Sequence, residues 1–127
     1  MTKQAIHTPD APQPIGTYSQ AVRAGDTLYL SGQIGLDPRT MLLVEGIDAQ
    51  IHQVFLNLGA VAAAGRATLD DAVKFTVFLT DMANFARVNE IMTGYVHAPY
   101  AARSAVAAAA LPRGALVEIE AILALRR

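Results

Sequence analysis

The feature that most constrains the fold is an 18-residue stretch, Ile47 to Ala64, in which apolar residues recur with helical spacing. The apolar positions share one stripe of an α-helix: Ile47, Ile51, Val54, Phe55, Leu58, Val61 and Ala62. Gly65 follows at the position where a left-handed C-cap belongs. The pattern predicts one long amphipathic helix, and the rest of the chain must supply the surface that covers its stripe.

Short segments with β propensity lie on both sides of this helix. Gly25-Asp26 separates the apolar runs Ala21–Arg23 and Thr27–Ser31, which is a hairpin signal. Asp37–Thr40 contains Pro38 and predicts another turn. Residues 74–80 (KFTVFLT) are rich in β-branched and aromatic residues and predict a buried strand.

The C-terminal half predicts a second helix and two more strands. Asn84 can cap a helix whose apolar stripe is Phe85, Val88, Ile91, Met92 and Tyr95. Residues 104–110 and 115–125 then flank Leu111–Gly114, which has the composition of a turn. The order ββαβαββ predicts a single α+β domain over 1–127, with helices packed on one face of a mostly antiparallel sheet.

The last strand separates an apolar face from a face that carries two carboxylates. Glu118 and Glu120 alternate with apolar residues and point to the same side, roughly 7 Å apart along the strand. If Leu111–Gly114 closes a simple hairpin, Arg103 and Ala105 share that side, which leaves space for a small anionic ligand. The alternative is a surface or interface ion pair, which such a trio of charges forms more often.

Composition limits the possible partners. The chain is 53% hydrophobic and 17% charged, so we expect part of its apolar surface to be buried in a homo-oligomer. Its net charge of −1, without a basic stripe, argues against nucleic-acid binding. No run approaches the roughly 20 apolar residues of a membrane span. There is no cysteine and no histidine cluster, so we expect a cytoplasmic protein without a metal or other cofactor.

Several segments resemble the RidA/YjgF family of reactive-intermediate deaminases, whose older label is endoribonuclease L-PSP. Residues 15–21 (IGTYSQA) are similar to the family's IGPYSQA, and residues 31–38 (SGQIGLDP) to SGQIPLDP. Phe85 with residues 88–90 (VNE) matches the start of a family helix. Arg103-Ser104, residues 111–115 (LPRGA) and residues 117–121 (VEIEA) match the closing signature, so the resemblance covers nearly the whole chain.

The resemblance implies a chorismate-mutase-like fold and a homotrimer with ligand sites between its subunits. It implies hydrolysis of small 2-imino acids, such as 2-iminopropanoate and 2-iminobutanoate, to 2-oxo acids and ammonia, with no cofactor. By position, Arg103 would bind the substrate carboxylate. Glu118 would orient or deprotonate the attacking water, and Tyr18 would line the pocket.

Further positions complete the predicted site. Backbone groups near Gly32 would hold the imine nitrogen, Asn89 matches another pocket position, and Glu120 is a weaker candidate that could serve trimer contacts. The chain departs from the family pattern at Thr17, Ala101 and Ala105, and its segment between Asn89 and Arg103 is short. Ala105 stands where many members have cysteine, and a mechanism based on water does not require a thiol.

Two other functions fit parts of this pattern. A trimer that binds small carboxylates without turnover, as a sensor or a protector of proteins, would use the same arginine. The older labels of the family, endoribonuclease and translation inhibitor, are disfavoured by the absence of a basic surface.

Overall fold

The computed structural model describes residues 2–126, which form six strands and two α-helices. In chain order these are β1 (Lys3–Ile6), β2 (Ala21–Ala24), β3 (Thr27–Gln33), α1 (Ile47–Ala64), β4 (Ala72–Leu79), α2 (Phe85–Met92), β5 (Ala102–Ala107) and β6 (Val117–Ala124). Three short 3-10 turns, η1 (Leu69–Asp71), η2 (Met82–Asn84) and η3 (Pro112–Gly114), precede β4, α2 and β6. The predicted first hairpin and both helices are confirmed, whereas β1 was not predicted.

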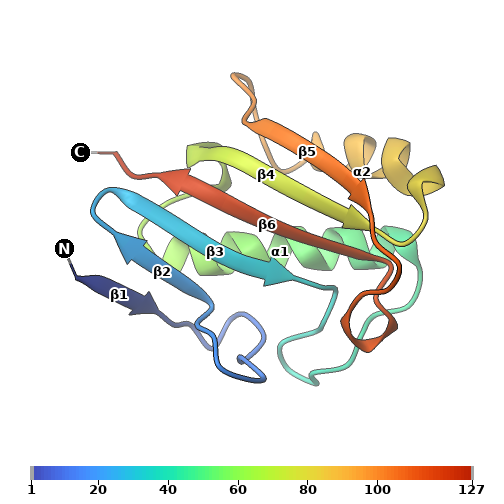
Figure 1. Cartoon of the computed structure of the whole chain (residues 1–127), viewed down its shortest axis with the longest axis horizontal. Coiled ribbons are helices and arrows are strands. Elements are labelled where there is room, and N and C mark those ends of the chain that lie inside the picture. The colour runs from blue at the N-terminus through green and yellow to red at the C-terminus, as the bar shows by residue number, and fades with distance from the viewer. Residues whose placement is uncertain (1, 127) are drawn as a thin grey trace.

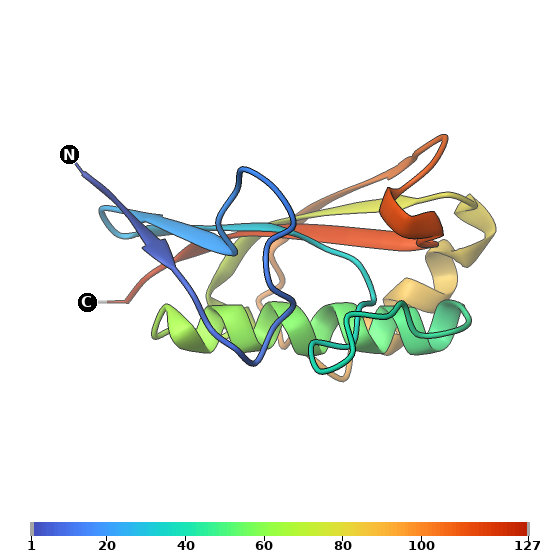
Figure 2. The same ribbon diagram turned by 90° about the horizontal axis from the view of Figure 1, so that it is seen from below.

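The strands form one sheet in the order β1-β2-β3-β6-β4-β5 (Figure 1). Every neighbouring pair is antiparallel except β4 and β5, which are parallel. Both helices pack against the same face, and the opposite face has no helix over it (Figure 2). We call these the helix face and the open face. The predicted α+β architecture is therefore confirmed.

The core lies between α1 and the helix face. The α1 stripe faces the sheet, and Ile51, Val54, Phe55, Leu58 and Val61 are fully buried. Burial of each such side chain stabilises the fold by about 1.5–3 kcal/mol. None of the helices within residues 2–126 has the length and apolarity needed to cross a bilayer.

The end of α1 differs from the prediction. Gly65 has φ −88°, and the left-handed residue is its neighbour Arg66, with φ 62°. Glycine is needed at position 65 for packing, because an added Cβ would lie 2.5 Å from Cδ2 of the buried Leu28. The predicted left-handed C-cap at Gly65 is therefore wrong. The small size of Gly65 instead allows α1 to pack closely against β3.

The predicted C-terminal hairpin is also wrong, because β4 lies between its two arms. β5 pairs with β4 alone, and β6 pairs with β4 and β3. The end of β4 is bonded to both flanking connections: the Ala108 N–H donates to the Leu79 carbonyl, and the Thr80 N–H donates to the Leu116 carbonyl. A central position suits the apolar β4, whose Phe75, Val77 and Leu79 are buried.

This insertion moves Arg103 away from the face on which it was predicted. Arg103 is aligned with Phe75, and Phe75 with Ala121, so Arg103 belongs to the helix face. Glu118 is aligned with Phe78 and lies on the open face. Glu120 is aligned with Thr76 and lies there too. The two carboxylates share a face, as predicted, but Arg103 does not share it with them in one chain.

Candidate active site

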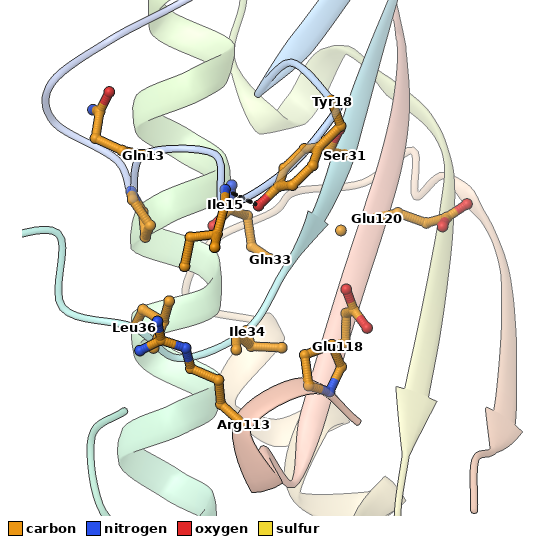
Figure 3. Close-up of a pocket in the computed structure, with 13 residues that line it drawn as sticks. Gln13, Ile15, Tyr18, Ser31, Gln33, Ile34, Leu36, Arg113, Glu118 and Glu120 are labelled. Carbon is orange, nitrogen blue, oxygen red and sulfur yellow. Dashed lines mark hydrogen bonds between the residues drawn. The ribbon is translucent and has the colours of Figure 1, made fainter. Parts of the chain in front are cut away.

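A cavity of about 640 Å³ lies between the segment before β2, the end of β3, η3 and β6. Its lining residues are Pro12, Gln13, Ile15, Tyr18, Ser31, Gly32, Gln33, Ile34, Leu36, Pro112, Arg113, Glu118 and Glu120. Figure 3 shows Tyr18 and Glu118 on different walls of this cavity. We call it the carboxylate cavity, and it brings together Tyr18, Gly32 and the two glutamates of the predicted site.

Glu118 has the environment of an acid–base group. Its side chain is half-buried, and within residues 2–126 neither it nor Glu120 makes a hydrogen bond or an ion pair. Burial raises the pKa of Glu118 above its ordinary value, and the negative charge of Glu120 raises it further. A carboxyl group with a raised pKa in a cavity is a candidate for proton transfer near neutral pH.

Gly32 makes room for this carboxylate. The pairing of β3 with β6 is irregular between Leu30 and Gln33, and this irregularity turns Gly32 towards Glu118. An added Cβ at Gly32 would lie 2.5 Å from Oε2 of Glu118 and 3.0 Å from its Cδ. Irregular strand positions of this kind are common beside active sites. Any side chain at position 32 would therefore displace the glutamate.

Tyr18 and Ile15 form an apolar wall opposite β6. The Tyr18 hydroxyl oxygen accepts a hydrogen bond of 3.1 Å from the Ile15 N–H. Both side chains are unusually exposed for their size, at 50% and 56%. Large apolar groups exposed beside a cavity are typical of binding surfaces.

Three buried amide side chains hold the walls of the carboxylate cavity in place. Gln20 donates from Nε2 to the carbonyls of Thr8, Ala11 and Pro12, and its Oε1 accepts from the Thr8 N–H. Asn57 donates to the carbonyls of Ile34 and Leu36, and Gln50 accepts from the Leu116 N–H. These residues were missed from the sequence. The available signal was the position of Gln50 and Asn57 beside the apolar stripe of α1.

Arg103 lies beside a second cavity, of about 300 Å³, between α2 and β5. Its lining residues are Phe75, Asn89, Met92, Thr93, Val96, Tyr100, Ala101 and Arg103. Arg103 Nη1 donates to the Asn89 side-chain oxygen, and the guanidinium lies 5.0 Å from the centre of the Phe85 ring. These contacts fix the arginine but leave it without a carboxylate partner among the described residues.

The predicted site residues thus fall into two groups in one chain. Tyr18, Gly32, Glu118 and Glu120 line the carboxylate cavity, and Arg103 and Asn89 line the second cavity. Ala105 lines neither, because its side chain packs against the core on the helix face.

The histidines contribute to surface contacts. His97 Nδ1 pairs with Asp70 at 2.9 Å, and His52 Nδ1 lies 2.7 Å from the Tyr95 hydroxyl. Within residues 2–126, no three His, Asp or Glu side chains form a group that could hold a metal ion.

The structure is thus a small α+β domain with two cavities lined by charged and polar residues. The sequence profile described as endoribonuclease L-PSP matches residues 8–125. A 2-iminobutanoate/2-iminopropanoate deaminase of Dermatophagoides farinae is 47% identical, and the match covers 95% of each chain. The chain therefore belongs to the RidA/YjgF family, which confirms the resemblance drawn from its motifs.

Solved structures agree with this membership. A crystal structure of RidA from an Antarctic Psychrobacter species superposes with a TM-score of 0.94 at 52% identity, covering 96% of this chain and 99% of that one. Escherichia coli TdcF with bound serine superposes with a TM-score of 0.90 at 35% identity, covering 98% and 99%.

Proposed function

We propose that this protein is a hydrolase that deaminates small 2-imino acids, such as 2-iminopropanoate and 2-iminobutanoate, to 2-oxo acids and ammonia. The observation that carries the proposal is a pair of charged groups at the cavities, the half-buried Glu118 and the guanidinium of Arg103, neither of which forms an ion pair among the described residues. The name of the Dermatophagoides relative agrees with the predicted activity. The serine held by TdcF supports a ligand the size of an amino acid.

The complete site would form between copies of the chain in a homotrimer. In one chain, Arg103 belongs to the helix face and Glu118 to the open face, so a single copy does not bring them together. The open face carries exposed apolar residues, including Tyr29 and Val106, that a second copy would cover. Docking of a neighbouring β5 edge over the carboxylate cavity would place its Arg103 opposite Glu118.

In this arrangement Arg103 fixes the substrate and Glu118 transfers protons. The planar guanidinium can bind the α-carboxylate with two parallel hydrogen bonds. Glu118 accepts a proton from a water molecule as the water oxygen bonds to the imine carbon, and the C=N electron pair moves to nitrogen. Glu118 returns this proton to the nitrogen, and the proton of the new hydroxyl group also passes to the nitrogen. The C–N bond then breaks as the C=O bond forms, which releases ammonia and the 2-oxo acid.

The remaining residues position these groups. Tyr18 lines the cavity, and backbone groups near Gly32 would hold the imine nitrogen. Asn89 orients Arg103 through its side-chain oxygen. Glu120 supports the raised pKa of Glu118. Ala105 lies two residues after Arg103 on β5, and we assign it no contact with the substrate. We place the activity in the cytoplasm and, as the family resemblance implies, assign the reaction no cofactor.

RNA cleavage receives little support from these features. The net charge is −1, and the sequence has no basic stripe that would follow a phosphate backbone.

The proposed activity is tested by trapping the imine. An amino-acid oxidase generates 2-iminopropanoate beside semicarbazide, and the purified protein competes with the trap. Wild type should lower semicarbazone formation, and Arg103→Ala should not. Arg39→Ala is the matched control, because Arg39 is exposed, pairs with Asp37 and lines neither cavity. Ligand binding without turnover by wild type would instead favour a carboxylate-binding sensor.

A further inference from the structure

We infer that the carboxylate cavity contains a second anion subsite at Arg113, which selects 2-imino acids whose side chain ends in a carboxylate. This inference rests on the proposed deaminase function and specifies its substrate class. Its starting point is a cation that lines the cavity and has no part in the mechanism described above.

The cavity is larger than the smallest substrates require. Its volume is about 640 Å³, and cavities of roughly 300–1,000 Å³ enclose ligands of drug size. A three-carbon imino acid held at Glu118 would not fill the part of this space that one copy of the chain provides. A longer side chain can therefore extend from the reacting carbon to another wall.

Arg113 presents a charge with free donors on such a wall. It lies in η3, and its Nη1 donates to the Met41 carbonyl at 2.9 Å. A guanidinium has five N–H groups, and this is the single hydrogen bond of the Arg113 side chain within residues 2–126. The Met41 contact fixes the direction of the side chain and leaves the other donors available.

Three of the other surface arginines form ion pairs, whereas Arg113, like Arg66 and Arg103, forms none among the described residues. Arg39 pairs with Asp37 at 3.2 Å, Arg87 with Asp48 at 2.8 Å, and Arg126 with Asp71 at 2.8 Å. No described carboxylate pairs with Arg113, although Glu118 lines the same cavity. Figure 3 shows the guanidinium on the Leu36 side, whereas the two glutamates project from β6. A ligand carboxylate at Arg113 would thus be separated from those like charges.

The wall between the two ends suits methylene groups. Ile15, Ile34, Leu36 and Pro112 give the cavity an apolar part of its lining. Figure 3 shows Ile34 between Leu36 and Glu118. A substrate side chain with an apolar stem and a terminal carboxylate would place its stem against these apolar residues and its carboxylate at Arg113. The five-carbon 2-imino diacid formed by oxidation of glutamate has that structure, and the imine from leucine has the stem without the terminal charge.

The test compares these imines in the trapping assay, with 2-iminopropanoate as the small reference. Arg113→Gln removes the charge but keeps an N–H donor for the Met41 carbonyl. It should lower kcat/KM for the diacid about tenfold, mainly through KM, because an exposed charge-assisted contact is worth about 1.4 kcal/mol. For the leucine and alanine imines, kcat/KM of Arg113→Gln should stay within about twofold of wild type. Arg39→Gln, the control on the neighbouring turn, should change none of them.

Two results would overturn the subsite. If Arg113→Gln lowers kcat/KM equally for all three imines, Arg113 acts only through the loop at Met41. If kcat/KM for the diacid is unchanged, Arg113 binds no substrate side chain. A separate measurement does not depend on turnover. By calorimetry, wild type should bind 2-oxoglutarate more tightly than pyruvate, and Arg113→Gln should remove the difference. Equal affinities in wild type would reject the subsite even if the imines are hydrolysed.

Discussion

Replacing Gly32 by alanine should impair catalysis far more than stability. The new Cβ would lie 2.5 Å from Glu118 Oε2, whereas ordinary contacts begin near 3.4 Å, so the carboxylate must move by about 1 Å. Position 32 is free of the positive φ that would add backbone strain. Because the obstructing atoms end a flexible side chain, we expect a loss of about 1 kcal/mol in the free energy of unfolding. A displacement of about 1 Å at a reacting group costs about 10²-fold in rate.

The assay for Gly32→Ala measures kcat/KM for 2-iminopropanoate together with urea unfolding. Gly59→Ala is the matched control: an added Cβ at that position in α1 meets nothing within 4 Å. The control should keep full activity, and its free energy of unfolding should rise by about 0.5–1 kcal/mol, because alanine has a higher helix propensity than glycine. Activity of Gly32→Ala within threefold of wild type would refute the reasoning, and so would a loss fully explained by unfolding.

Three further changes follow from the same contacts. Glu118→Gln should abolish turnover yet raise the melting temperature at pH 7. The pKa of Glu118 in the folded state lies above 4.5, so wild type loses stability as the pH rises through that raised pKa. The melting temperatures of the two proteins should converge below about pH 4.5. Glu120→Gln should lower the pKa of Glu118 and move the acidic limb of the kcat/KM profile to lower pH; an unmoved limb would show that Glu120 does not act on it. Gln20→Ala should cost about 2–4 kcal/mol in urea unfolding, since it leaves buried carbonyls before β2 unpaired; a loss below about 1 kcal/mol would contradict this.

Local periodicity was sufficient to predict the elements that carry most of the core. The apolar stripe predicted the bounds of α1, Ile47–Ala64, as observed. The alternation in β6 correctly placed Glu118 and Glu120 on one face. Both results depend only on the period of a helix or a strand, which a single segment reveals.

The neighbours of a strand depend on the whole sheet, and this is where the prediction of the site geometry was wrong. Residues 111–114 have turn composition, but the connection from β5 to β6 passes the end of β4 instead of closing a hairpin. Nothing in the spacing of Arg103 and Glu118 reveals the inserted strand. The short N-terminal β1 was missed because four mostly exposed residues carry no periodic signal.

The most direct test of the account asks whether one site takes Arg103 and Glu118 from different copies. Arg103→Ala and Glu118→Gln are purified separately and as mixed trimers co-expressed with different tags, and each is assayed with 2-iminopropanoate. Each variant alone should be inactive. A mixed trimer contains both variants, so one of its three sites would hold both native groups, and about one third of wild-type activity should return. Verified mixed trimers as inactive as their parents would contradict a site shared between copies.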